Sequence, residues 1–317
     1  MHRAISCLKK TAPPPQIAAL RQFYLYICTD FIEGTDKAMK KIVSIQDISD
    51  LGKCSLTAAL PVVSALGVEC AVLPTAVLST HTQFKGFTFH DLTDEMEPTA
   101  RHWKEQSIRF DAIYTGYLGS YRQIEIVKRF FADFGEGALR VVDPAMADNG
   151  VLYTGFTPEF AHKMAELCDG ADVVLPNITE ACFMLGRDYR ESYDEEYIME
   201  LLLGLKGLGA KNCVLTGVSF EKGKLGAVCL DSATGETFRY FTEHLPKNFH
   251  GTGDLFSAAV AGGVVRGLGL NEALTLACDF TCESIRLTIA EPDHNDYGVN
   301  FEQAIPYLIA RAEELEK

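Results

Sequence analysis

No apolar run in this 317-residue chain is long enough to cross a membrane, because Gly, Pro or charged residues interrupt every stretch within about ten positions and a spanning helix needs roughly 18. Basic residues are also scarce: 29 Lys and Arg stand against 43 Asp and Glu, for a formal charge of −14. Surfaces that follow nucleic-acid phosphates are usually basic. We therefore expect a soluble protein with no membrane or nucleic-acid partner. A small phosphate-bearing ligand would be held by local backbone groups.

Several catalytic and redox motifs are missing as well. The chain has no G-x-x-x-x-G-K-[ST], strand-linked G-x-G-x-x-G, G-x-S-x-G or H-E-x-x-H, so Walker, dinucleotide, hydrolase and zinc-protease mechanisms lack their key residues. None of the ten cysteines forms a C-x-x-C pair. The i,i+4 spacing of Cys278 and Cys282 is typical of one buried helix face. With no secretory signal, these reduced thiols predict a cytoplasmic location.

The first 38 residues differ from the rest of the chain. They carry five basic and three acidic side chains and the breaker run Pro13-Pro14-Pro15, and they lack the apolar core of a signal peptide. Met39 then opens a new pattern, two lysines followed by an apolar strand. We expect residues 1–38 to be a leader, either non-native, with Met39 as the native start, or poorly ordered. Residues 39–317 should form a single domain.

From Lys41 onward, short β-rich runs alternate with helical stretches, a pattern typical of a mainly parallel sheet covered by helices. The expected parallel strands are apolar, as strands buried on both faces should be: Ile42–Ile45, Glu69–Leu73, Ala112–Thr115, Leu139–Val142, Asp172–Leu175 and Cys213–Thr216. Leu225–Leu230 and Thr237–Phe241 predict an antiparallel edge hairpin. The expected helices are Ser55–Leu66, Tyr121–Phe134, Pro158–Cys168, Ile178–Leu185, Glu195–Leu208, Gly253–Arg266, Asn271–Ala290 and Phe301–Leu315.

Polar residues follow four of these strands: Asp47, Gly116-Tyr117, Asp143-Pro144 and Pro176-Asn177. Ligands of such sheets bind at the carboxyl ends of the strands, where loops and helix N-termini converge. Each group by itself is typical of a turn or helix cap. The four together predict a functional site at this edge of the sheet.

The most informative segment runs from His250 through Gly251, Thr252 and Gly253 to Asp254, and it opens a helix of small residues. Glycines let successive N–H groups converge, and a helix N-terminus adds unsatisfied donors, so this segment predicts an anion site. A carboxylate beside such a site is suited to act as a general base toward a hydroxyl that receives a phosphoryl group. The alternative is a simple capping acid.

A second acidic group consists of Asp143, Asp148 and Glu180, which lie near two successive strand ends. Mg²⁺ prefers oxygen ligands and is usually held by one or two carboxylates, waters and substrate phosphates. These acids predict such a site, bound directly or through water.

Gly251–Asp254 resembles the signature of ribokinase-like sugar and vitamin kinases. Five further segments, in matching order, are similar to the pyridoxal kinase branch of these enzymes: Ser44–Gln46, Leu78–Gln83, Thr115–Ser120, Asp143–Asp148 and Pro176–Glu180. The resemblance covers about residues 40–290. It implies a three-layer αβα fold and ATP-dependent phosphorylation of the 5′-hydroxymethyl group of pyridoxal, pyridoxamine or pyridoxine in vitamin B6 salvage. It also implies Mg²⁺, in many members K⁺, and a homodimer.

The resemblance further implies roles for individual residues. The transfer would involve the base Asp254 and an anion hole made by Gly251, Thr252 and Gly253. The vitamer would lie near Thr82, Tyr117, Asp47 and Asp254. The metal and phosphates would be served by Asp143, Asp148 and Glu180, with Asn177 nearby and Thr216 at the start of the nucleotide site.

Asp47 departs from the pattern of well-known pyridoxal kinases, which carry Ser there, whereas hydroxymethylpyrimidine kinases often carry Asp. A carboxylate could pair with a ring nitrogen, the ring hydroxyl or the ammonium of pyridoxamine, which leaves vitamer preference open and favours pyridoxamine. Asp254 argues against a pyrimidine kinase, because many of those enzymes have Cys at this position. His250 occurs in both groups and does not distinguish them. Two alternatives therefore stay open: a hydroxymethylpyrimidine kinase of the same fold, and a non-catalytic protein that binds B6.

Overall fold

The computed structural model describes residues 38–317. The expected leader therefore falls, apart from Ala38, outside the described residues. Lys40–Lys317 form one compact unit. No helix in the described part of the chain is long and apolar enough to span a membrane.

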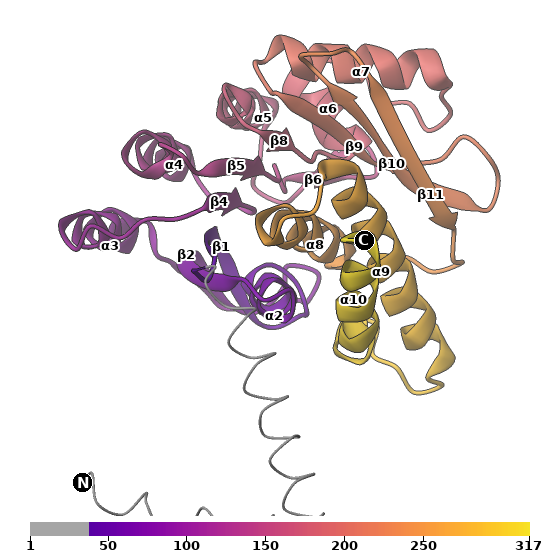
Figure 1. Ribbon diagram of the computed structural model, residues 1–317, viewed down its shortest axis with the longest axis horizontal. Helices are drawn as coiled ribbons and strands as arrows, with labels where there is room; N and C mark the ends of the chain where they lie inside the picture. The colour runs from indigo at the N-terminus through magenta and orange to yellow at the C-terminus, as the bar shows by residue number, and fades with distance from the viewer. Residues whose placement is uncertain (1–37) are drawn as a thin grey trace, which may run out of the picture. The chain divides into compact units, whose positions relative to one another are not determined.

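A nine-stranded sheet runs through the middle of this unit, in the order β11-β10-β9-β8-β5-β4-β1-β2-β3 (Figure 1). The six central strands are parallel: β1 (Lys41–Leu51), β2 (Glu69–Thr80), β4 (Ala112–Thr115), β5 (Leu139–Val142), β8 (Val173–Val174) and β9 (Asn212–Val218). Three antiparallel strands complete the two edges: β3 (Phe89–Asp91), β10 (Lys224–Asp231) and β11 (Thr237–Glu243). A separate small hairpin consists of β6 (Ala147–Asp148) and β7 (Val151–Leu152).

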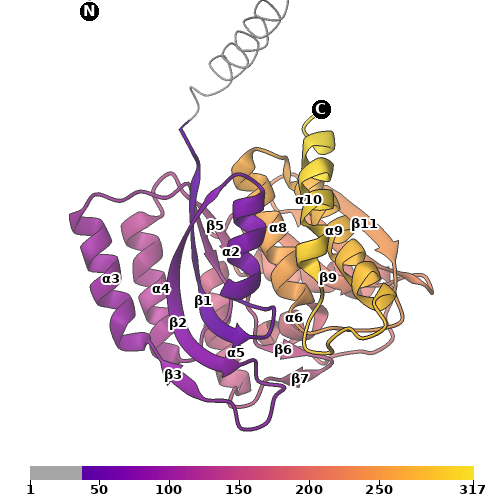
Figure 2. The same cartoon turned by 90° about the horizontal axis from the view of Figure 1, so that it is seen from below.

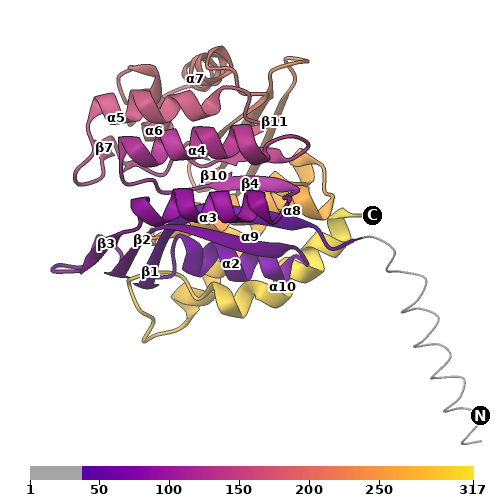
Figure 3. The same cartoon turned by 90° about the vertical axis from the view of Figure 1, so that its left-hand side faces the viewer.

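Helices cover both faces of the sheet (Figures 1 and 3). One layer contains α3 (Thr93–Glu105), α4 (Tyr121–Phe134), α5 (Pro158–Met164) with the 3₁₀ turn Ala165–Cys168, α6 (Ile178–Leu185) and α7 (Glu195–Gly207). The other contains α2 (Leu56–Ala65), α8 (Thr252–Arg266), α9 (Leu270–Ala290) and α10 (Phe301–Leu315). The predicted three-layer α/β fold with an antiparallel edge hairpin is thus confirmed.

Each face of the sheet has its own apolar core, because strands such as β4 are buried along their whole length and alternate side chains between the two layers. The elements that the sequence did not indicate are helix α3, strand β3 and the small hairpin of β6 and β7. Helix α3 is largely polar, buries only Thr93 and Met96 and contains Pro98, so few apolar residues mark it in the sequence. Strands β1 and β2 run well past their predicted ends. Together with β3 they extend beyond the other strands, toward the bottom of Figure 2.

Candidate active site

A cavity of about 610 Å³ opens along the carboxyl ends of the central strands. Its volume is in the range of small-molecule and cofactor sites. Its walls include every residue that the sequence predicted for the site: Asp47, Thr82, Tyr117, Asp143, Asp148, Asn177, Glu180, Thr216, Gly251, Thr252, Gly253 and Asp254. The fold therefore gathers residues up to 207 positions apart into one cavity. Their individual roles stay predictions.

The glycine segment adopts the conformation that its composition predicts. Gly251 lies in the left-handed region, with φ of 80°, and a Cβ there would collide with the carbonyl oxygen of Lys53. A Cβ on Gly253 would meet no atom within 4 Å. Helix α8 begins at Thr252, one residue earlier than predicted, so its free N–H groups and positive dipole end face the cavity. This wall can hold an anion.

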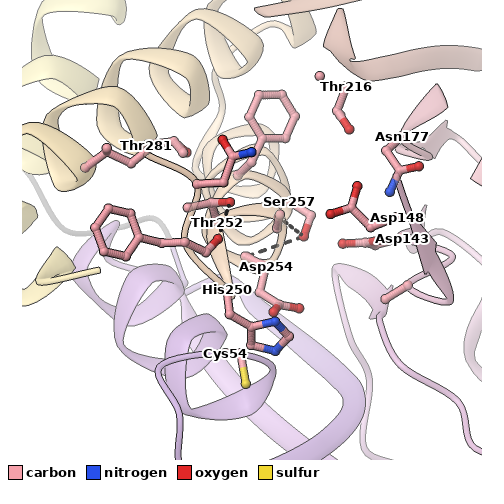
Figure 4. A pocket seen from close by; sticks show the side chains of 18 of the residues that line it. Cys54, Asp143, Asp148, Asn177, Thr216, His250, Thr252, Asp254, Ser257 and Thr281 are labelled. Carbon is pink, nitrogen blue, oxygen red and sulfur yellow. Dashed lines mark hydrogen bonds between the residues drawn. The ribbon is translucent and has the colours of Figure 1, made fainter. Parts of the chain in front are cut away.

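Asp254 lies in the first turn of α8, and its carboxyl faces the same cavity (Figure 4). Burial, and then the nearby Asp143, raise the pKa of Asp254 to about 8, while the backbone N–H of Ser55 opposes the rise. A carboxylate with a pKa near the working pH is suited to act as a general base.

Asp143 follows β5 and faces α8 (Figure 4). It is 7% exposed, and its burial raises its pKa, while a hydrogen bond from Ser257 opposes the rise. The Ser257 hydroxyl lies 2.6 Å from the Tyr114 hydroxyl. The Ser257 hydroxyl donates to the Gly253 carbonyl oxygen at 3.0 Å, so Tyr114 can donate its own proton to the Ser257 oxygen.

Glu180 supports the loop that carries Asp148. Its Oε1 accepts from the N–H of Met146 at 3.1 Å, and its Oε2 accepts from the N–H of Asn177 at 2.8 Å. Asn177 in turn caps the N–H of Glu180 at 2.9 Å, which completes a capping box on α6. The backbone of Asn177, just after β8, also forms a parallel β-bridge with Thr216 of β9. The carboxyl of Glu180 is thus already committed to backbone donors.

We expect Glu180→Ala to lower the free energy of unfolding by about 2–5 kcal/mol, because each buried donor left without a partner costs about 1–3 kcal/mol. Glu180→Gln keeps one acceptor oxygen and should lose less. Urea unfolding of both variants measures the difference. A loss below about 0.5 kcal/mol for the alanine variant would show that water satisfies these N–H groups.

The cavity is strongly acidic. Seven carboxylates line it, with Lys247 as the one lysine or arginine among the lining residues. Within residues 38–317, no three His, Cys, Asp or Glu side chains converge closely enough to form a metal site by themselves. A cation that takes one or two carboxylates and completes its shell with phosphates and water fits this donor set. Asp143 and Asp148 are the remaining candidate ligands, since both oxygens of Glu180 accept from backbone N–H groups. Asp148 is exposed, and its oxygens accept from the neighbouring Asn149 at 2.8 and 2.9 Å.

Asp47 and Tyr117 lie at the end of the cavity formed by β1 and β4. Asp47 sits at a bulge where β1 shifts its register against β2, not beyond the strand as predicted, and such bulges re-aim side chains. It is 5% exposed, and burial raises its pKa although the Ser49 hydroxyl donates to it at 3.1 Å. The Tyr117 ring packs against Phe156, with centroids 5.5 Å apart, and burial raises the pKa of Tyr117 to about 12. Thr82 is exposed at the rim.

Two histidines lie in contact at this wall. The rings of His81 and His250 have centroids 4.1 Å apart, and burial lowers the pKa of His250 to about 4. His81 has a backbone partner, because its Nε2 lies 3.0 Å from the carbonyl oxygen of Tyr297. Its ring is therefore held in place by the protein backbone.

Several lining residues had no sequence signal. Ser49, Ser55, Ser257 and Tyr153 also face the cavity. Serine and tyrosine are common in loops and helices, and only the tertiary fold brings these four beside the carboxylates. Ser257 lies one turn after Asp254, which is the one spacing that could have indicated it.

Known proteins resemble this chain in sequence and in fold. The family model described as phosphomethylpyrimidine kinase matches residues 54–300. A crystal structure with pyridoxal of a candidate phosphomethylpyrimidine kinase from Bacteroides thetaiotaomicron is 38% identical, with a TM-score of 0.81, and covers 85% of this chain and 96% of that one. Pyridoxal kinase from Lactobacillus plantarum is 32% identical, with a TM-score of 0.79, over 87% of this chain and 99% of that one. Hydroxymethylpyrimidine/phosphomethylpyrimidine kinase from Haemophilus influenzae is 27% identical over 78% of this chain and 91% of that protein.

Proposed function

The chain belongs to the phosphomethylpyrimidine kinase family, and on that premise we propose that it transfers the γ-phosphoryl group of ATP to the 5′-hydroxymethyl group of a vitamin B6 vitamer. The observation that carries the proposal is the placement of Asp254, with its pKa near 8, beside the N–H groups of Gly251–Gly253 in a cavity of ligand size.

The choice of a B6 vitamer has two supports. A relative 38% identical to this chain has been crystallised with pyridoxal. Asp47, at the end of the cavity beside the Tyr117 ring, is buried and accepts a hydrogen bond from the Ser49 hydroxyl. A buried carboxylate of this kind favours a substrate that brings a proton donor or a positive charge, such as a pyridinium nitrogen or the ammonium of pyridoxamine.

In the proposed reaction, Asp254 accepts the proton of the 5′-hydroxyl as its oxygen attacks the γ-phosphorus. The bond from that phosphorus to the β–γ bridging oxygen breaks, and ADP leaves. The N–H groups of Gly251–Asp254 stabilise the charge on the transferred group. Asp143 and Asp148 would hold Mg²⁺, which when bound offsets phosphate charge. Asn177 and Thr216 would lie along the nucleotide. The expected K⁺, homodimer and cytoplasmic location stay predictions.

Hydroxymethylpyrimidine is the second candidate substrate. The matching family model and the Haemophilus influenzae relative favour it, and a buried Asp47 can pair with an aminopyrimidine as well as with a pyridine.

A coupled assay of ADP formation on pyridoxal, pyridoxamine, pyridoxine and hydroxymethylpyrimidine tests these assignments. We expect turnover on the vitamers to exceed turnover on the pyrimidine, with pyridoxamine well used. A clear preference for the pyrimidine would contradict the proposed substrate. Vitamer binding without phosphate transfer from Mg-ATP would identify a non-catalytic B6-binding protein instead.

The pKa of Asp254 also predicts a pH dependence. Because its pKa is raised to about 8, most of this group is protonated in the free enzyme at pH 7 and cannot accept a proton. We expect kcat/KM to rise with pH and to level off above about pH 8. Initial rates from about pH 6 to about pH 9.5 measure this rise in kcat/KM. A kcat/KM that does not change with pH would contradict the role of Asp254 as the base.

A further inference from the structure

Helix α4 carries a buried amide in its first turn. Gln123 is 1% exposed and is the third residue of the helix, after the capping residue Ser120. Its backbone N–H donates to the Ser120 hydroxyl at 3.3 Å. In a capping box the side chain at this position reaches back to the N–H of the capping residue. Here Gln123 Oε1 instead accepts from the N–H of Gly119, one residue earlier, at 2.7 Å.

The nitrogen of the same amide holds the edge of the sheet. Gln123 Nε2 donates to the Thr75 carbonyl oxygen of β2 and to the Thr93 hydroxyl of α3, both at 2.9 Å. Asp91 Oδ1, at the end of β3, lies 3.3 Å from the same nitrogen. Glutamate, the other usual residue of a capping box, would place an oxygen against this carbonyl and this carboxylate and would be repelled by both. The position therefore requires an amide.

These hydrogen bonds fix the loop 116–120, which connects β4 to α4 and carries Tyr117. Gln123 holds the loop at the N–H of Gly119. Thr75, which is fully buried, holds it a second time, because its hydroxyl donates to the Tyr117 carbonyl oxygen at 3.2 Å. Since Gln123 also binds the Thr75 carbonyl oxygen, both anchors of the loop depend on the one amide.

The anchored backbone determines where the Tyr117 ring lies. A Cβ on Gly119 would stand 3.5 Å from Tyr117 Cε1 and 3.7 Å from its hydroxyl oxygen, so the ring lies over Gly119. The ring also packs against Phe156, which stacks on Phe160 of α5 with centroids 4.2 Å apart. The position of the ring in the cavity therefore depends on the backbone at Gly119, and through it on Gln123.

We propose that Gln123 is a positioning residue for the substrate: it fixes the backbone at Gly119 and Tyr117 and so holds the Tyr117 ring where the flat ring of a B6 vitamer packs. The contact between Tyr117 and the vitamer rests on the proposed function, whereas the anchoring of the loop does not. Tyr117 lines the cavity and Gln123 and Thr75 do not. Their effect on the substrate must therefore pass through the loop.

Two substitutions remove the anchors. Gln123→Met keeps the length of the side chain and loses every hydrogen bond of the amide. Thr75→Val keeps the shape of the residue and loses the hydroxyl that holds the Tyr117 carbonyl. Its matched control is Thr75→Ser, which keeps the hydroxyl and loses the methyl group. Ile126→Ala removes a buried side chain of the same helix that makes none of these hydrogen bonds, and so controls for a loss of stability alone.

Steady-state kinetics separate positioning from a general loss of structure. We expect KM for the vitamer to rise about three- to tenfold in Gln123→Met and in Thr75→Val, the range of a lost aromatic contact. KM for ATP and kcat should stay within about twofold, because the ring contact is equal in the ground state and the transition state. Thr75→Ser and Ile126→Ala should keep the wild-type values. Equal rises in both KM values, or a rise in Ile126→Ala as large as in Gln123→Met, would overturn the proposal.

A double-mutant cycle shows whether Gln123 acts through Tyr117. Tyr117→Ala should raise KM for the vitamer by itself, and adding Gln123→Met should raise it no further. If the two effects multiply, Gln123 acts independently of the ring and the proposal is wrong.

Amide hydrogen exchange, followed by NMR, measures the anchor without any substrate. The Gly119 N–H should exchange at least about tenfold faster in Gln123→Met than in the wild-type protein, because it loses its acceptor. It should stay slow in Thr75→Val, which keeps that acceptor. An unchanged rate in Gln123→Met would contradict the anchor. A wild-type protein that phosphorylates no vitamer would remove the proposed function, and the exchange rates would still decide whether Gln123 anchors the loop.

Discussion

Asp254→Asn should lower kcat by about 10² to 10⁴, the usual contribution of a positioned general base. The amide has nearly the shape of the carboxyl and cannot accept the hydroxyl proton. It also removes a carboxyl whose burial near Asp143 is unfavourable when charged, so we expect stability to be unchanged or slightly higher. Single-turnover measurements with saturating ATP and vitamer separate the chemical step from binding.

Asp293→Asn makes the same change at an exposed position outside the cavity and should leave turnover within about twofold. Near-normal turnover in Asp254→Asn would refute the role of base. The capping-acid interpretation of Asp254 would then stand, and a lower melting temperature in the variant would support it.

The two glycines of the anion segment should respond in opposite ways to alanine. Gly251→Ala forces a Cβ against the Lys53 carbonyl at a left-handed φ, so we expect a loss of about 2 kcal/mol or more in the free energy of unfolding. Gly253→Ala meets no atom of the protein and lies in the first turn of a helix, so the fold should tolerate it. Its Cβ would instead occupy the space where the phosphates approach, and we expect kcat/KM for ATP to fall about 10²-fold.

Thermal unfolding of both variants, together with ATP kinetics of Gly253→Ala, tests the pair. Each variant is the control for the other, because both add one methyl group within three residues. Wild-type ATP kinetics in Gly253→Ala would place the phosphates elsewhere. Equal stability of the two variants would show that the backbone at Gly251 relaxes around the new Cβ.

Several strands and helices could be predicted from the sequence with their limits. The limits predicted for β4, β5, α4 and α6 agree with the structure, because continuous apolar runs and strong caps such as Ser120 and Asn177 mark them locally. Helix α3 and strand β3 escaped prediction because they lie at the edge of the sheet. An edge element buries few side chains, so few apolar residues mark it in the sequence.

At the candidate site, too, the sequence determined some properties and the tertiary structure determined others. Sequence alone determined which residue types come together, because glycines, an adjacent carboxyl and strand-end acids in a fixed order leave a motif, and all twelve predicted residues line one cavity. Only the tertiary structure decided what each can do. Burial and the proximity of Asp143 raise the pKa of Asp254, and the backbone N–H groups of Met146 and Asn177 occupy the carboxyl of Glu180. These properties depend on desolvation and on contacts between residues far apart in the chain, which no local pattern of side chains encodes.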